Sequence, residues 1–222
     1  MDEDQLTLIR RIARVVGHEL RNPLAVINNS TYFLKTKLGQ DGKLDPKVEK
    51  HLGIVVSEVG RADRMIAEIL AYSRALEIKP ARFSLNALVE TAVAAAAVTE
   101  KINIKKELAK GMPEVEVDEA LFGGVLKRLL DNAIDALPAE GGVVTVTTAI
   151  VKKEAVVAVK DAGAGIKTEI LPLLFEPFAT TKPRGLGLSL AMVKKIVLAH
   201  KGRVEGGNKA GGGAEFRISL PA

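Results

Sequence analysis

The chain has 222 residues, a formal net charge of +5 and no cysteine, which excludes disulfides, thiolate nucleophiles and cysteine metal sites. Its basic residues are scattered among 27 acidic ones and do not alternate with aromatics, so nucleic-acid binding is not expected. No apolar run reaches the roughly 18 residues of a membrane span, and no signal peptide is found. We therefore expect a cytoplasmic, soluble chain, which can also be the soluble portion of a membrane-attached parent protein.

Helical spacing of apolar residues marks the first third of the chain. Apolar residues recur three or four positions apart over 6–38, and as a heptad repeat over 52–76. Glycines interrupt the pattern at 39–42, and Asp45 followed by Pro46 is typical of a helix N-terminus. This predicts an antiparallel helical hairpin. Since one hairpin cannot bury its own seam, we expect two to form a four-helix bundle in a homodimer. The alternative is that the hairpin docks onto the rest of the chain.

After Pro80 the sequence mixes strand and helix patterns. We expect a short strand at Phe83, with Ser84 or Asn86 capping the next helix, and Asp118 capping a later one. Val115 and Val117 are expected to continue the main sheet. The pattern predicts an α+β domain with helices on one face of a mixed sheet. Its expected elements are helix 85–98, strand 102–108, helix 119–137, hairpin 143–160, loop 161–184, helix 186–200 and hairpin 202–220.

One helical segment, VVGHELRNPLAVI, carries an unusual set of polar residues. His18 lies two positions from seam residues on either side, so it should point away from the seam. Glu19 can orient or deprotonate its imidazole, and Asn22, one turn further, can position a water. Pro23 cannot donate to the Glu19 carbonyl, so we expect a bend that opens access to the histidine. A lone exposed histidine is usually just solvated, but these neighbours favour a nucleophile.

The segment HELRNP resembles the H-box of sensor histidine kinases, with Gly17 where that family usually has Ser or Ala. Four further segments resemble the family's N-box, G1 box, F-box and G2 box. Each is weak evidence alone, because such short motifs arise by chance. Their shared order behind a helical hairpin makes the resemblance specific, and it covers roughly residues 10–220. In order, the four segments are 129–136, 161–166, 174–178 and 182–190.

The resemblance implies two domains and a reaction. Residues 1–79 would be a dimerisation and histidine phosphotransfer hairpin. Residues 80–222 would be a catalytic ATP-binding domain, an α+β two-layer sandwich of the Bergerat (GHKL) ATPase type. His18 would take the γ-phosphate of ATP, with Glu19 as general base, and would pass it to an aspartate of a response-regulator receiver domain. Asn22 matches the position that this family links to dephosphorylating the regulator.

The resemblance also assigns a nucleotide site. Asn132 would hold Mg²⁺, which binds oxygen ligands and phosphates. The carboxylate of Asp161 would accept the adenine amino group, with glycines allowing close approach of the backbone. Cations and glycines before the helix at 186–200 would bind phosphates. The remaining residues assigned to ATP are Gly163, Gly165, Lys182, Arg184, Gly185 and Gly187.

Two departures from the family pattern leave alternatives open. Arg128 stands where many members carry a second asparagine, and Ser189 stands at the third glycine of the G2 box. A non-catalytic dimeric scaffold with a degenerate nucleotide site is therefore one alternative. Another is an ATPase of the same fold that forms no phosphohistidine. The two other histidines are expected to have no chemical role. His51 is expected to be solvated, and His200 is expected at a helix C-terminus, where a partial positive charge on the side chain is favourable.

Overall fold

The computed structural model describes residues 3–39, 45–182 and 185–222, and side chains from residue 20 onward. Two compact units are present, Met1–Ala75 and Leu76–Ala222. Within the described part of the chain, no helix is both long enough and apolar enough to cross a membrane.

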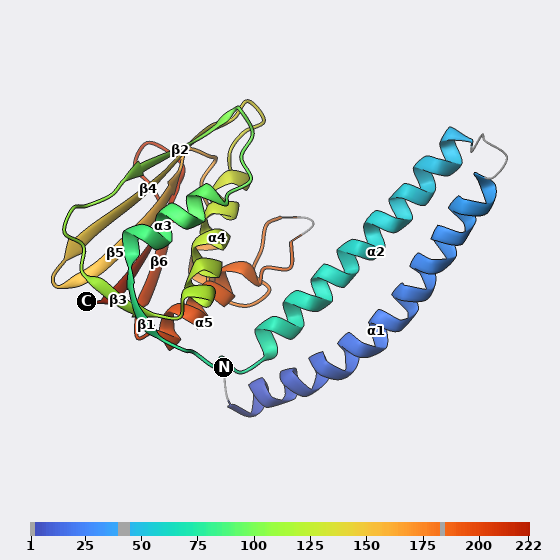
Figure 1. The fold of residues 1–222 in the computed structure, drawn as a ribbon, viewed down its shortest axis with the longest axis horizontal. Helices are drawn as coiled ribbons and strands as arrows, with labels where there is room; N and C mark the ends of the chain where they lie inside the picture. Colours follow the sequence, from blue (N-terminus) through green and yellow to red (C-terminus); the bar gives the residue numbers. More distant parts are fainter. Residues whose placement is uncertain (1–2, 40–44, 183–184) are drawn as a thin grey trace. The chain divides into compact units, whose positions relative to one another are not determined.

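The first unit is a hairpin of two helices, α1 (Glu3–Leu38) and α2 (Pro46–Ser73), which lie side by side and antiparallel (Figure 1). Asp45 begins α2 as predicted: its Oδ1 accepts a hydrogen bond from the Lys47 N–H at 2.7 Å, and Pro46 follows as the first helical residue. The predicted hairpin is confirmed.

Among the hairpin side chains that the structure describes, from residue 20 onward, one narrow row is buried. Val59, Ile66 and Ser73 recur every seven residues along α2 and are 5–7% exposed, and Thr31 of α1 is also buried. Over the same residues, most of the predicted seam of α1 is uncovered. The large apolar side chains exposed in this part of the hairpin are Leu20, Val26, Ile27, Tyr32, Phe33, Leu34, Leu38, Val48, Ile54, Val55 and Val56.

The second unit is built on a five-stranded mixed sheet in the order β2-β4-β5-β7-β6. β2 pairs with β4 in parallel, and the other neighbours are antiparallel. The strands are β2 (Ile102–Glu107), β4 (Gly142–Val151), β5 (Glu154–Asp161), β6 (Arg203–Asn208) and β7 (Ala214–Pro221).

A separate two-stranded sheet pairs β1 (Ala81–Ser84) with β3 (Glu114–Val117). The prediction that Val115 and Val117 continue the main sheet is therefore wrong. Both side chains are buried, as their alternation with exposed glutamates indicates, but alternation reports which face is buried and not which strand is the partner.

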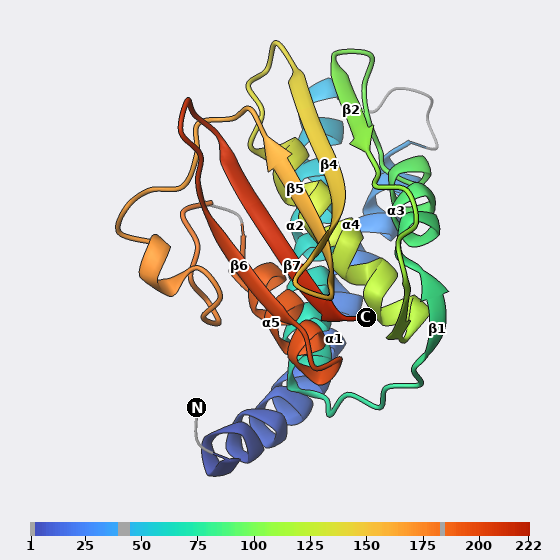
Figure 2. The ribbon, with the colours of Figure 1, turned by 90° about the vertical axis from the view of Figure 1, so that its left-hand side faces the viewer.

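Three helices cover one face of the main sheet (Figure 2): α3 (Leu85–Ala94), α4 (Glu119–Asp135) and α5 (Ser189–Ala199). Ser84 caps α3 and Asp118 caps α4 through side-chain oxygens that accept from N–H groups of the first turn. The core lies between helices and sheet, where Phe122 and Leu129 of α4 and Val157 and Ile218 of the central strands are fully buried. A short 3₁₀ helix, η1 (Leu171–Leu173), interrupts the long loop before α5.

The opposite face of the sheet carries paired charges. Arg203 binds Glu154 through two hydrogen bonds of 2.8 and 2.6 Å, and Lys160 lies 3.3 Å from Glu215. At one end of the strand order, β2 exposes Lys105 and Lys106. The face opposite the helices thus carries charged pairs, while Val156 and Ala158, on the same side of β5 as Glu154 and Lys160, are buried.

Candidate functional site

The C-terminal end of α4 meets the loop that follows β5. Asn132 lies half-buried on the last turns of α4, and Asp161 ends β5 with only 3% of its surface exposed. Gly163 packs so closely on the Ala136 carbonyl that any Cβ there would overlap it. Glycine is required at this point, and the structure brings two of the predicted motifs into contact.

Asp161 is held through one of its two carboxylate oxygens. Oδ1 accepts hydrogen bonds from the Gly163 N–H at 2.9 Å and from the Ala214 N–H at 3.2 Å. Among the described residues, Oδ2 has no hydrogen-bond donor. Oδ2 is also not among the fully buried unpaired atoms of the described residues, so it is accessible from outside the protein. The carboxylate is thus fixed in orientation and keeps one acceptor for a ligand.

The segment after η1 joins the same site. Lys182 Nζ lies 2.9 Å from Asp135 Oδ2, one turn beyond Asn132 on α4. Phe178 adopts a positive φ of 66°, and its N–H donates to the Gly187 carbonyl at 3.1 Å. The predicted phosphate ligand Lys182 therefore already has a carboxylate partner here. Arg184, predicted for the same role, lies outside the described residues.

The N-terminus of α5 lies at the end of this segment. Leu188 precedes the helix and makes no side-chain cap hydrogen bond, so the first N–H groups of α5 have no capping side chain. Such uncapped N–H groups, together with the helix dipole, attract anions. Ser189 is the first helical residue, so replacing the usual third glycine does not interrupt the helix.

Arg128 does not reach toward Asn132. Its Nη1 donates to the Gly124 carbonyl at 3.1 Å, one turn back along α4, whereas Asn132 lies one turn forward. The arginine is thus directed away from the asparagine and does not replace it as a ligand.

The phosphoacceptor segment belongs to α1. This helix continues without interruption through Pro23, and Asn22 is exposed on it. His18 and Glu19 lie in the same helix, but their side chains are outside the described part of the structure. The outward direction of the histidine, and the bend expected at Pro23, stay predictions.

The described residues contain no group of three or more His, Asp or Glu side chains arranged for a metal ion. The single amide oxygen of Asn132 fits an arrangement in which Mg²⁺ takes most of its ligands from phosphates and water.

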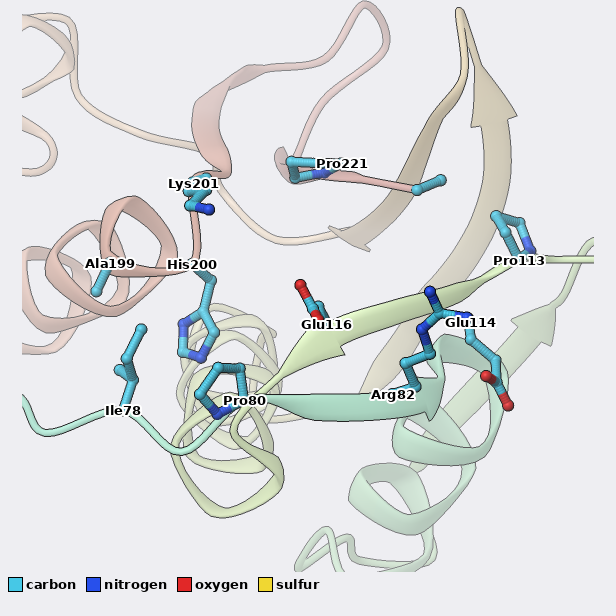
Figure 3. A pocket seen from close by; sticks show the side chains of 11 residues that line it. Ile78, Pro80, Arg82, Pro113, Glu114, Glu116, Ala199, His200, Lys201 and Pro221 are labelled. Carbon is cyan, nitrogen blue, oxygen red and sulfur yellow. The ribbon is translucent and has the colours of Figure 1, made fainter.

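A cavity of about 570 Å³ lies elsewhere in this unit, at the C-terminal end of α5 (Figure 3). Ile78, Pro80 and His200 line it, and none of the predicted nucleotide ligands does. His200 is the C-cap residue of α5, which confirms its expected position at a helix end, and it is 5% exposed. Its Nε2 accepts from the Asp118 N–H at 2.9 Å, and its Nδ1 lies 2.8 Å from the Ile196 carbonyl. Because Nε2 accepts a hydrogen bond, Nδ1 is the ring nitrogen that can donate to the Ile196 carbonyl.

Asp118 connects this end of the domain to the preceding segment. Its carboxylate accepts from the Leu121 N–H at 3.0 Å and from the Lys79 N–H at 2.9 Å. These backbone hydrogen bonds, that of Leu121 first, lower the pKa of Asp118 below its ordinary value. His200 and Asp118 thus hold the start of α4 to the end of α5.

Comparison with known proteins identifies both units. Residues 8–77 match the family described as His Kinase A (phospho-acceptor) domain. Residues 117–222 match the family described as histidine kinase-, DNA gyrase B-, and HSP90-like ATPase. The chain belongs to the sensor histidine kinases. The resemblance seen in the sequence is thereby confirmed, as is the fold class of a helical hairpin followed by a GHKL-type sandwich.

Individual relatives of this histidine kinase chain extend over nearly all of it. It is 30% identical over 221 residues to the signal transduction histidine-protein kinase AtoS of Escherichia coli (strain K12), covering 98% of the chain but 36% of AtoS. Its structure resembles the histidine kinase ThkA in complex with the response regulator protein TrrA (TM-score 0.70, 25% identity, covering 98% of this chain and 63% of that one). Full-length ShkA in complex with AMPPNP shares the fold, with a TM-score of 0.76 and 23% identity; the match covers 95% of this chain and 45% of ShkA.

Proposed function

We propose that this chain is an ATP-dependent protein-histidine kinase that phosphorylates His18 and passes the phosphoryl group to an aspartate of a response regulator. In this proposal residues 1–79 are the dimerisation and phosphotransfer part, and residues 80–222 bind ATP. The main support is the half-satisfied carboxylate of Asp161, which lies beside α4 and whose Oδ2 keeps an acceptor for a ligand.

The adenine end of the nucleotide would bind at Asp161. Its Oδ2 accepts a hydrogen bond from the exocyclic amino group, while Oδ1 remains bonded to the Gly163 and Ala214 N–H groups. A charged acceptor that is already oriented gives a stronger and more selective hydrogen bond than a mobile one. Gly163 and Gly165 keep the backbone free of side chains beside the base.

The phosphates would bind at the other side of the site. The uncapped N–H groups of α5 face them behind Gly185 and Gly187, and Lys182 supplies a positive charge once it leaves Asp135. Arg184 adds a second charge in this proposal. Asn132 would hold Mg²⁺ through its side-chain oxygen, and the bound ion would offset the charge of the phosphates.

In the phosphorylation step, a neutral nitrogen of His18 attacks the γ-phosphorus. A nitrogen–phosphorus bond forms, the bond from the γ-phosphorus to the bridging oxygen breaks, and ADP leaves with that electron pair. Glu19 takes the proton that the imidazole loses. A regulator aspartate then attacks the same phosphorus and releases the histidine. Asn22 would orient a water for the reverse task, hydrolysis of the regulator's acyl phosphate.

A homodimer would complete the hairpin. Among the side chains described from residue 20 onward, eleven large apolar ones are exposed on α1 and α2, and contiguous exposed apolar surface typically marks an interaction site. A second copy of the hairpin has the matching apolar face, and two hairpins make a closed four-helix bundle.

The deciding experiment is incubation of the full chain with γ-labelled ATP and Mg²⁺. The proposal requires a base-stable, acid-labile label on the protein, mapped by mass spectrometry to His18, and transfer of that label to a receiver domain. His18→Gln should abolish the label and leave ATP affinity unchanged; His51→Gln, at an exposed position of α2, is the matched control. Release of free phosphate without protein label would identify an ATPase, and no turnover would identify a scaffold.

A further inference from the structure

The loop that follows Asp161 is anchored at its far end by a residue more than forty positions away. Asn208, the last residue of β6, makes two hydrogen bonds to one residue of the loop. Its Oδ1 accepts from the Ile166 N–H at 2.6 Å, and its Nδ2 donates to the Ile166 carbonyl at 2.8 Å. Only this orientation of the amide satisfies both groups. The side chain thus pairs with Ile166 as a neighbouring strand's backbone would.

The loop has few other anchors. Among the described residues, no backbone–backbone hydrogen bond outside helices and strands involves residues 162–166. Its hydrogen bonds come from two side chains: Asp161, which accepts from Gly163, and Asn208, which binds Ile166. A loop without backbone–backbone hydrogen bonds of its own depends on such side-chain contacts to keep a single conformation. Losing either anchor would free one end of it.

Gly165 lies directly against Asn208. It adopts a φ of 77°, and a Cβ built on it would come 2.8 Å from Asn208 Oδ1. The second glycine of the DAGAG segment is therefore explained by this contact as well as by its backbone conformation. The glycine and the asparagine form one unit that sets the path of the loop.

The β6–β7 hairpin thus contacts both ends of the loop. Asn208 holds Ile166 at one end, and the Ala214 N–H donates to Asp161 Oδ1 at the other. Both residues flank the glycine-rich turn 209–213. The hairpin therefore fixes at once the carboxylate and the backbone that follows it.

We propose that Asn208 is a positioning residue of the nucleotide site, which orders residues 163–166 for the purine ring without touching it. This inference rests on the ATP site proposed above. Preorganising a loop in its bound conformation raises affinity because less freedom is lost on binding. Removing two partly solvated hydrogen bonds should weaken ATP binding about five- to ten-fold. The rate at saturating ATP should stay within about two-fold, because the phosphates are bound elsewhere.

The test compares the wild-type chain with Asn208→Ala and with Asn103→Ala, a matched change at an exposed strand position. ATP affinity is measured by calorimetry, and autophosphorylation is measured over a range of ATP concentrations. Hydrogen exchange is followed by mass spectrometry without nucleotide. We expect a higher dissociation constant and a higher KM for ATP in N208A only. We also expect faster hydrogen exchange in this variant, confined to peptides that cover residues 162–168.

Wild-type affinity in N208A, or slower turnover with unchanged KM, would overturn the inference and leave the kinase assignment intact. A wild-type chain that binds no ATP would instead refute the proposed function. If circular dichroism shows that N208A does not fold, the Asn208→Asp variant is measured in its place. It keeps the acceptor for the Ile166 N–H and the size of the side chain, but lacks the donor to the Ile166 carbonyl, so it should still raise KM.

Discussion

Changing Asp161 to asparagine isolates the single atom on which base recognition depends. The amide oxygen of the variant can still accept from the Gly163 and Ala214 N–H groups, so the loop should keep its conformation. The position of Oδ2 becomes an NH₂ group, which is a donor facing the donor of adenine. The variant therefore loses a hydrogen bond to a charged group, about 1.5–3 kcal/mol, which corresponds to about 10- to 150-fold weaker ATP binding.

Calorimetric titration of wild-type and D161N chains with ATP and with inosine triphosphate tests this reasoning. Inosine carries an oxygen acceptor in place of the amino group, so the variant should lose much of its preference for ATP over the inosine nucleotide. Asp63→Asn, at an exposed position of α2, is the control for removing one charge. Equal ATP affinities for D161N and wild type, with the fold intact, would refute the role given to Oδ2.

Three further predictions concern stability and assembly. His200→Ala should lower the free energy of unfolding by about 3 kcal/mol, measured by urea titration, because the half-buried Asp118 N–H loses its acceptor and removal of the buried ring opens a cavity. Asp118→Asn should cost stability near neutral pH, and this cost should shrink below about pH 4. The pKa of Asp118 is lower in the folded state than in the unfolded state. Its ionised carboxylate therefore stabilises the fold at pH values above the unfolded-state pKa, and this stabilisation is lost as the pH falls through the folded-state pKa. Phe33→Asp, at a 59% exposed position, should convert the dimer to monomers in sedimentation.

Each of these has a contrary outcome. Unfolding curves that coincide for His200→Ala and wild type would mean that the buried ring contributes nothing. A stability difference for Asp118→Asn that stays constant down to pH 3 would contradict the lowered pKa. A monomeric wild-type chain would remove the argument drawn from the exposed apolar face, and Glu68→Gln on α2 is a control that should leave association unchanged.

Local signals in the sequence predicted most helices and strands. They failed where contacts between distant residues determine which strands pair. Caps such as Asp45 and Asp118 act within four residues, so their patterns predicted the helix starts. The alanine-rich helix was expected to reach Val98 but ends at Ala94, because helix propensity alone does not fix an end. The partner of β3 could not be predicted, since β1 lies some thirty residues earlier.

The same limit applies to the candidate site. The motif residues Asn132, Asp161 and Gly163 could be singled out because they lie in short recognisable segments. Asn208 was missed: an asparagine before a glycine-rich turn reads as a turn residue, and only the fold shows its contact with Ile166. His200 was expected at a helix end, where it lies, but nothing nearby in the sequence signals its hydrogen bond from the Asp118 N–H, which is 82 positions away.

The lysines on β2 have a consequence for assembly. An unpaired strand at the border of a sheet offers free N–H and C=O groups on which another chain can add a strand. β2 is such a border strand, and the adjacent exposed Lys105 and Lys106 place like charges where a second copy would have to align. In the homodimer proposed above, these charges would oppose strand addition at β2 between the second units of different chains.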